Sequence, residues 1–275
     1  MSILPIYRSF LWRLGRRLYM SARSDATLTP DKNGEYWLQD KILNSFSDSH
    51  YRYVFFDIGA NISEWTNSIL DISTKQNKNC SVHLFEPASE TYNYLKLAHA
   101  NSSRVKLNNI ALSNRSEDTQ IYIHESMSAI NSLYQNGYKS VEKVQALKLD
   151  DYVKFEKINH IDFIKSDTEG HDFKVILGAE DSLKNGVIDI WQFEYNSKWI
   201  NARNYLKDVF DFVEDMDYFV GKISKNGVEV FDKWHPELER FFESNYLLIK
   251  KNNKLSKNLY KNVIFNQYNV LISKE

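Results

Sequence analysis

Cysteine, net charge and long apolar runs are all scarce in this chain. One cysteine, Cys80, occurs in 275 residues. It excludes an intrachain disulfide and a cysteine-based zinc cluster, and it favours a reducing compartment. The 35 basic and 36 acidic residues nearly cancel, so no global field points to a nucleic-acid partner. No apolar run approaches the roughly 18 residues of a membrane span. Arg13, Arg16 and Arg17 interrupt the one N-terminal apolar stretch, which argues against a signal peptide and for a cytoplasmic protein.

Apolar side chains are nevertheless abundant enough for a sizeable core. They make up 43% of the chain, and aromatic residues make up 14%. The length predicts one large domain with appendages. Composition divides the chain into a basic N-terminal helix with a linker (1–34), a main domain (35–250) and a Lys/Asn-rich tail (251–275).

Residues 2–20 predict a basic amphipathic helix. Tyr7, Phe10, Leu14 and Leu18 follow a three-to-four spacing, and no acidic residue precedes Asp25. One interpretation is peripheral attachment to an anionic membrane surface, such as the inner face of the cell membrane. The other is a helix that packs on its own domain or on a sister subunit of a homo-oligomer, which we favour because most amphipathic helices pack.

The stretch from Tyr53 to Thr66 organises the chain. Its apolar, β-branched start predicts a buried strand that ends at Asp57, and the spacing of Trp65, Ile69 and Leu70 predicts a helix beginning near Ser63. A strand, a tight turn and a helix in this order form the usual nucleotide crevice of an open α/β sheet. Gly59 allows the backbone to approach a ligand closely.

This turn is neither a dinucleotide fingerprint nor a P-loop. The first would need more glycines and the second a lysine near a phosphate. An acid, Asp57, stands instead where it can bind an ammonium group. An ordinary strand, turn and helix would also account for the pattern.

Two further strands are predicted before residue 112. The first ends at Glu86 before Pro87, which places a carboxylate where it can accept hydrogen bonds from both hydroxyls of a ribose. Residues 105–111 read as the second, and its exit offers Asn109, Ile110 and Ala111 for contact with an adenine. Residues 112–149 then alternate apolar and polar side chains, which predicts an antiparallel excursion whose polar loop overhangs the site.

The stretch 161–172 ends another buried strand in a cluster of titratable side chains. Asp167, Glu169, His171 and Asp172 gather at the sheet edge that also receives Asp57. Carboxylates crowded in one crevice repel one another, so a bound cation, an ammonium group or a proton-transfer role would explain them. Stabilisation by a helix N-terminus would account for Asp172 but poorly for Asp167.

Four ordered motifs resemble the FkbM family of class I methyltransferases, which use S-adenosylmethionine (SAM). They are Asp57-Ile58-Gly59-Ala60-Asn61, Phe85-Glu86-Pro87, Ile164-Lys165 with Asp167 and Glu169-Gly170, and Gln192-Phe193-Glu194-Tyr195-Asn196. The resemblance spans about residues 50–250. It implies a Rossmann-like α/β sandwich with a mostly parallel, seven-stranded sheet whose last strand is antiparallel.

The implied reaction is transfer of a methyl group from SAM to a hydroxyl of a sugar, a glycan or another small natural product. The acceptor's proton would pass to a carboxylate or histidine. The catalytic candidates are Glu169, Glu194, His171 and Asp167. The cofactor-binding candidates are Asp57, Gly59, Ala60, Asn61, Glu86, Asn109, Ala111 and Asp167.

Two alternatives stay open at this point. One is a non-catalytic binding or scaffold protein that keeps the fold. The other is a metal-assisted sugar O-methyltransferase, in which Asp167, Glu169 or Glu194 would hold Mg²⁺, although we predict no metal site. The family pattern has glycine where this chain has Ser63, whose side chain would either narrow the cofactor loop or cap the following helix.

Overall fold

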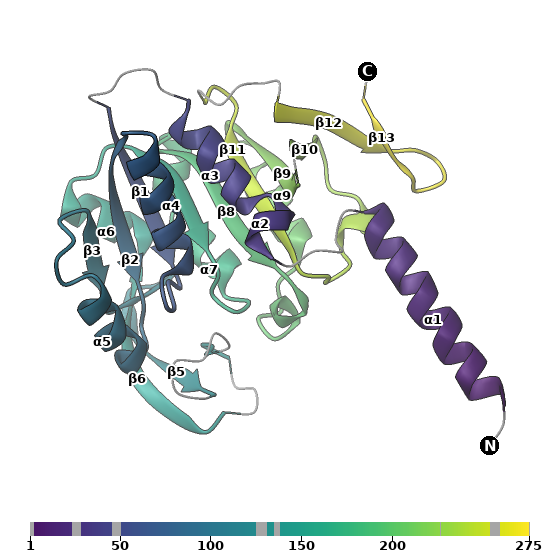
Figure 1. Cartoon of the computed structure of the whole chain (residues 1–275), viewed down its shortest axis with the longest axis horizontal. Helices are drawn as coiled ribbons and strands as arrows, with labels where there is room; N and C mark the ends of the chain where they lie inside the picture. Colours follow the sequence, from purple (N-terminus) through teal and green to yellow (C-terminus); the bar gives the residue numbers. More distant parts are fainter. Residues whose placement is uncertain are drawn as a thin grey trace.

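A single large β-sheet with helices on both faces forms the body of the protein (Figure 1). The computed structural model describes residues 3–23, 29–45, 51–124, 131–134, 138–225, 227–253 and 259–274. The strands of the main sheet are β1 (Arg52–Ile58), β2 (Asn79–Phe85), β3 (Val105–Asn108), β7 (Ile161–Ser166), β8 (Ile188–Tyr195), β9 (Tyr218–Ser224), β10 (Gly227–Phe231), β11 (Ser244–Lys250), β12 (Tyr260–Phe265) and β13 (Leu271–Ser273).

The strand order is β13-β12-β10-β9-β11-β8-β7-β1-β2-β3. Strands β3, β2, β1, β7 and β8 run parallel, and β11 is antiparallel to both β8 and β9. The mostly parallel sheet and its antiparallel closing strand are therefore confirmed.

The predicted number of seven strands is too low for the whole sheet. Strand β10 adds to the edge of β9, and the C-terminal residues set apart as a tail supply β12 and β13. The edge of β10 offers backbone N–H and C=O groups that need partners, and β12 provides them.

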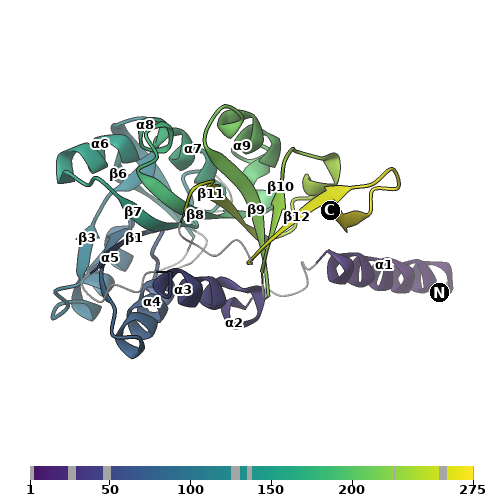
Figure 2. The same ribbon diagram turned by 90° about the horizontal axis from the view of Figure 1, so that it is seen from above.

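Helices cover the two faces of the sheet in separate groups (Figure 2). One face carries α3 (Glu35–Leu43), α4 (Glu64–Lys75) and α5 (Ser89–Ala98), with α2 (Pro30–Asn33) beside them. The other carries α6 (Leu149–Glu156), α7 (Asp172–Leu177), α8 (Glu180–Lys184) and α9 (Leu206–Val213). Two 3₁₀ turns, η1 (Ser197–Ile200) and η2 (Pro236–Leu238), complete the regular elements.

The side-chain alternation of β1 explains these two layers. Tyr53 and Phe55 pack with α3 and α4, whereas Phe56 and Ile58 pack with α6 and α7. Successive side chains of a strand point to opposite faces, so an almost continuous apolar run buries the strand on both sides.

The predicted antiparallel excursion is a second, three-stranded sheet. It consists of β4 (Ala111–Ser113), β5 (Glu117–Ile123) and β6 (Ser140–Lys148), with β5 antiparallel to β6. Parts of its predicted loop, residues 125–130 and 135–137, lie outside the described residues. The described part, residues 131–134, returns toward the main sheet, where Ser132 Oγ donates a hydrogen bond of 3.3 Å to the carbonyl of Glu169.

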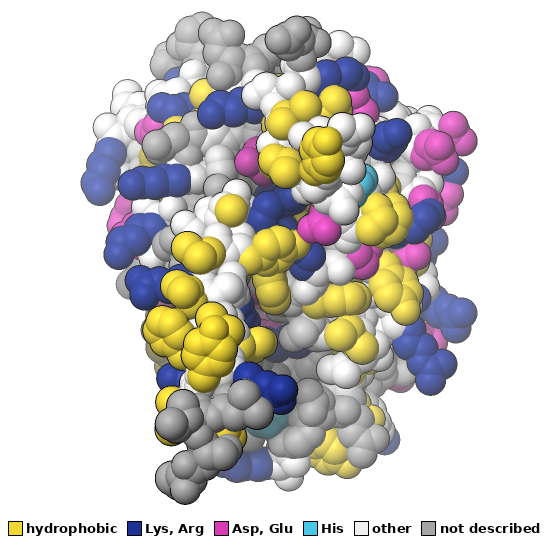
Figure 3. Space-filling model, turned by 90° about the vertical axis from the view of Figure 1, so that its right-hand side faces the viewer, with side chains coloured by type: hydrophobic (Ala, Val, Ile, Leu, Met, Phe, Trp, Pro, Cys, Tyr) yellow, Lys and Arg dark blue, Asp and Glu magenta, His cyan; other side chains and the backbone are white. Residues whose placement is uncertain are grey.

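Helix α1 (Ile3–Ala22) projects from one end of the body (Figures 1 and 2). Among the described side chains of α1, those near its C-terminal end contact the domain: Tyr19 Oη donates a 2.6 Å hydrogen bond to Glu237, and the Arg16 guanidinium lies 5.4 Å from the ring centre of Phe242. Figure 3 faces this end of the molecule and shows hydrophobic side chains beside Lys and Arg. The favoured expectation, packing on the domain, thus describes only the end of α1 near Tyr19.

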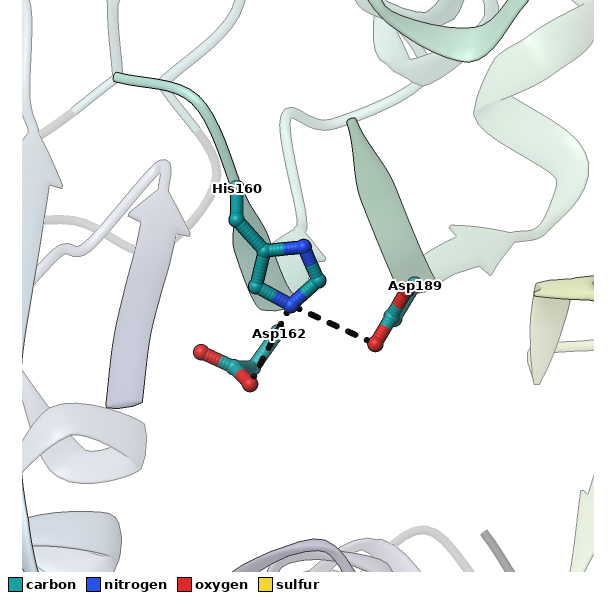
Figure 4. Close-up of side chains that lie close together, drawn as sticks. All are labelled: His160, Asp162 and Asp189. Atoms are coloured by element: carbon teal, nitrogen blue, oxygen red, sulfur yellow. Dashed lines mark ion pairs between the residues drawn. The ribbon is translucent and has the colours of Figure 1, made fainter. Parts of the chain in front are cut away.

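A histidine lies between two aspartates at the amino ends of β7 and β8 (Figure 4). His160 Nε2 is 3.4 Å from Asp162 Oδ1 and 3.3 Å from Asp189 Oδ2. Both oxygens of buried Asp162 also accept hydrogen bonds, from Tyr51 Oη at 2.6 Å and from the Val54 amide at 2.8 Å. Hydrogen bonds to the two carboxylates raise the pKa of His160 to about 9, so its positive charge balances the pair.

Replacing His160 by glutamine should change how stability depends on pH. A pKa that is higher in the folded chain gives stability that is fully present below the ordinary histidine value of 6.5 and is lost as pH rises through about 9. We expect His160→Gln to lower the free energy of unfolding most below that window and to have little effect above it. Urea unfolding at a series of pH values measures the free energy of unfolding of both proteins. If the difference between them does not change with pH, His160 does not balance the charge of the two aspartates.

Candidate functional site

A cavity opens at the carboxyl ends of β1, β2 and β7. The loop after β1, the exit of β2, the residues before β4, segment 131–134 and the turn after β7 all contribute to it. Its walls are formed by Ile58, Gly59, Asn61, Phe85, Glu86, Pro87, Ile110, Ala111, Leu112, Ile121, Asn131, Ser132, Leu133, Asp167, Thr168, Glu169 and His171. The structure therefore brings Gly59, Asn61, Glu86, Ala111, Asp167, Glu169 and His171 together, as the sequence predicts.

The loop after β1 is held against its neighbours by backbone contacts. The amides of Gly59 and Ala60 both donate to the carbonyl of Phe85, at 3.0 and 3.2 Å. Gly59 has φ +76°, and a Cβ there would lie 2.1 Å from the carbonyl oxygen of Asp167. Glycine is required here by close packing on the exit of β7, in addition to any approach to a ligand. Ala60 is buried within the loop and does not line the cavity.

Ser63 adopts a left-handed conformation, with φ 63°, directly before α4. This explains why the family pattern has glycine there, because a side chain at positive φ costs about 1–2 kcal/mol. Its hydroxyl does not bond the backbone N–H groups of α4 and instead lies 2.9 Å from His99 Nε2. Since Ser63 is not part of the cavity wall, its side chain does not narrow the cofactor loop.

Asp57 is fully buried behind the loop. Its Oδ2 accepts a 2.6 Å hydrogen bond from Thr66 on α4, and its Oδ1 has no hydrogen-bond partner among the described residues. Burial raises the pKa of Asp57, while nearby Lys165 opposes that rise. The side chain does not line the cavity, so the expected direct contact with a ligand ammonium is not prepared in this geometry.

Glu86 faces the cavity from the end of β2. Its two oxygens accept hydrogen bonds from the amides of Asn61 at 3.0 Å and Ala88 at 2.9 Å. Burial raises its pKa to about 7. Neighbouring Asn109 is turned away: its Nδ2 donates to the carbonyls of Glu86 and Pro87, and Asn109 is absent from the cavity wall.

Two carboxylates of the turn after β7 line the cavity next to lysines. Asp167 Oδ2 is 3.3 Å from Lys165 Nζ, and Glu169 forms an ion pair with Lys198 of η1. Burial lowers the pKa of Lys165, but Asp167, Asp57 and Glu35 outweigh that effect and raise it, so Lys165 is charged.

Glu194 lies deeper than the sequence predicts. It accepts a 2.5 Å hydrogen bond from Asn196 Nδ2 and is absent from the cavity wall. Burial, followed by the charges of Asp167 and Glu243, raises its pKa well above the ordinary value. Asp172 is fully buried, and burial together with the charge of Asp167 raises its pKa to about 7. This edge of the sheet therefore has an excess of buried acids over its two lysines.

His171 is held by hydrogen bonds at both ring nitrogens. Nδ1 lies 2.9 Å from Tyr134 Oη, and Nε2 lies 3.0 Å from Ser113 Oγ. Burial, aided by Lys174, lowers its pKa to about 4. A neutral ring with both nitrogens engaged is a poor proton acceptor near pH 7.

Residue-by-residue analysis of the sequence missed Ser113, Ser132, Leu133 and Tyr134 as parts of the site. Three of them fall in the polar loop predicted to overhang it: Ser132 and Leu133 line the cavity, and Tyr134 contacts His171. The Ser- and Asn-rich composition of this loop was the only available signal.

Comparison with known proteins decides the family. The methyltransferase FkbM domain matches residues 57–220, which is more than half of the chain and includes all four motifs. The chain belongs to the FkbM methyltransferase family. No curated protein matches it significantly.

Solved structures with a similar arrangement are distant in sequence. The FkbM methyltransferase of Methylobacillus flagellatus is 13% identical, with a TM-score of 0.46, over 76% of this chain and 47% of that one. The N-terminal domain of human METTL16 is 15% identical, with a TM-score of 0.44, over 80% and 69%. TrmK of M. capricolum, solved with S-adenosylhomocysteine, is 10% identical, with a TM-score of 0.39, over 78% of this chain and 68% of that one. This chain spans about half the length of the Methylobacillus protein.

SAM is the cofactor of this FkbM family member, and the cavity fits it in charge. Buried carboxylates in excess of lysines favour a cationic ligand, and SAM carries both a sulfonium and an ammonium. Asp57 Oδ1 is a further buried acceptor that no described residue satisfies, although it lies behind the loop and not in the cavity wall. Glu86 would hold the ribose, and Ile110 and Ala111 offer apolar and backbone contact for the adenine.

Glu86→Ala should weaken SAM binding by about 10²-fold or more, because charge-assisted hydrogen bonds are worth about 1.5–3 kcal/mol each. Wild-type affinity should also rise as pH increases through about 7, where Glu86 ionises, and Glu86→Gln should remove that dependence. Isothermal calorimetry measures both effects. Unchanged affinity in a folded Glu86→Ala protein would show that the ribose is bound elsewhere.

Proposed function

We propose that this protein transfers a methyl group from SAM to a hydroxyl oxygen of a sugar, a glycan or another small natural product. One observation carries the proposal: the carboxylates Asp167 and Glu169 line the same cavity as the cofactor elements Gly59 and Glu86. A proton acceptor and a cofactor site in one cavity are what O-methylation requires.

The chemistry divides between cofactor and chain. When bound, SAM supplies an electrophilic methyl group on a sulfonium. The chain aligns the acceptor oxygen so that the new O–CH₃ bond forms as the S–CH₃ bond breaks. The hydroxyl proton leaves to a carboxylate at the cavity wall, for which Glu169 is the first candidate and Asp167 the second.

The lysines support this assignment. Lys198 pairs with Glu169 and Lys165 with Asp167, so each candidate carboxylate is held in place at the cavity wall. The same pairing disfavours the metal-assisted alternative, because a Mg²⁺ ion would compete with two ammonium groups for these oxygens. Glu194 stands behind the wall and acts at most by positioning, and His171 is the weakest base of the four candidates.

Calorimetry with SAM and S-adenosylhomocysteine separates an enzyme from a non-catalytic scaffold. We expect both to bind, and we expect S-adenosylhomocysteine release when SAM is supplied with hydroxyl acceptors from a panel of sugars and glycans, with or without EDTA. Loss of that release in EDTA would favour the metal-assisted alternative. Failure to bind SAM would identify a scaffold.

Glu169→Gln should reduce turnover by about 10²-fold, the usual scale of general-base loss, while SAM affinity changes little. The amide keeps the shape and removes the proton acceptor. Glu194→Gln should cost less, because that side chain does not reach the cavity wall.

Steady-state kinetics with the acceptor found in the panel measures the effect. Glu214→Gln, an exposed carboxylate after α9, is the matched control. Wild-type turnover in Glu169→Gln would mean that catalysis here depends on alignment alone.

A further inference from the structure

The exposed surface of α1 is a feature that methyl transfer does not use. Tyr7, Phe10, Leu14 and Leu18 form an apolar stripe at three-to-four spacing, with side chains 56%, 61%, 43% and 61% exposed. Such a stripe on a helix is ordinarily buried against another element. Here the contacts of α1 with the domain come from Arg16 and Tyr19, which lie off that stripe.

Positive charge surrounds the stripe. Arg8, Arg13 and Arg17 are exposed on the same helix, and no acidic residue occurs before Asp25. No helix within the described ranges is both long and apolar enough to cross a bilayer.

We propose that α1 docks the protein on an anionic lipid surface, lying in the plane of the membrane with the apolar stripe immersed. An apolar stripe flanked by arginines matches the two layers of such a surface, acyl chains beneath anionic headgroups. Its position supports this role, because α1 projects from the body (Figure 1) and the residues of the stripe are exposed.

Charge argues against two other occupants. Pairing α1 with its counterpart in a second copy would bring arginines together with no acid on either helix to balance them. A nucleic acid would engage the arginines and leave the apolar stripe in water. Only a surface that is both anionic and apolar uses the two features together.

Docking through α1 would also place a groove beside the candidate active site next to the membrane. A groove between α1 and the body is lined by Trp12 and Arg16 on one side and by Ser197 and Phe242 on the other. Ser197 is followed by Lys198, the partner of Glu169 in the cavity wall. The proposal itself concerns the surface alone, so it stands whether or not the chain methylates a hydroxyl.

Co-sedimentation of the full chain with lipid vesicles tests the docking. We expect binding to vesicles of equal parts phosphatidylcholine and phosphatidylglycerol, weak binding to phosphatidylcholine alone, and release by high salt. The charge-reversal variant Arg8→Glu/Arg13→Glu/Arg17→Glu should bind about 100-fold more weakly or worse, since each basic residue near such a surface contributes about fivefold. The stripe variant Phe10→Ser/Leu14→Ser/Leu18→Ser should lose binding as well.

Matched controls change similar side chains elsewhere. Lys75→Glu/Lys96→Glu/Lys261→Glu makes the same charge change, and Leu97→Ser/Phe155→Ser replaces apolar side chains that are 80% and 79% exposed. Both should bind like the wild type. Equal binding by the wild type and both helix variants would overturn the proposal. So would a wild-type dimer in sedimentation that the stripe variant dissociates, because the stripe would then be a subunit interface.

Discussion

The missing side chain at Gly59 is the constraint on which the site depends. A Cβ there would meet the Asp167 carbonyl at 2.1 Å, so only glycine lets the loop after β1 lie against the exit of β7. The amide of Gly59 bonds the end of β2, and the Asp167 amide bonds the Ile58 carbonyl. Three strand ends are thereby tied through a few backbone contacts. Glu86 and Asp167 reach the same cavity because of them, although 80 residues separate them in the chain.

The second constraint is the pairing of charged side chains on neighbouring strands. Asp57, Lys165 and Gln192 are register neighbours on β1, β7 and β8, and Gln192 Nε2 donates to Glu35 of α3 at 2.7 Å. The half-buried ammonium of Lys165 therefore compensates acids on several elements at once. Burying unpaired carboxylates costs free energy. A cationic ligand bound near the acids that no lysine pairs with would offset that cost. The unpaired acids that cost free energy in the folded chain therefore also favour cationic over anionic ligands.

Strand positions and their terminal acids could be predicted because a buried parallel strand leaves a long apolar run and ends in a turn. The direction of each side chain could not. Period two puts Asp57 on the face of Tyr53 and Phe55, toward α4, so it bonds Thr66 instead of entering the cavity. Asn109 turns to backbone carbonyls for similar local reasons. The extra strands β12 and β13 were unpredictable because their stability comes from the free edge of β10, a contact that no local pattern records.

The two sides of the cavity have different origins in the fold, and this limits what the family implies. The cofactor side is built from β1, β2 and the turn after β7, which belong to the parallel core. The opposite wall is built from segment 131–134, which is an addition to that core, whereas η1 and α1 line a separate groove. Function lies in sites placed on a fold, and acceptor choice lies in such additions. Tyr134 of this segment contacts His171, and Lys198 of η1 pairs with Glu169, so elements outside the core also position titratable groups of the cavity wall. Under the proposed O-methylation, these additions would therefore both contact the acceptor and position the carboxylate that takes its proton.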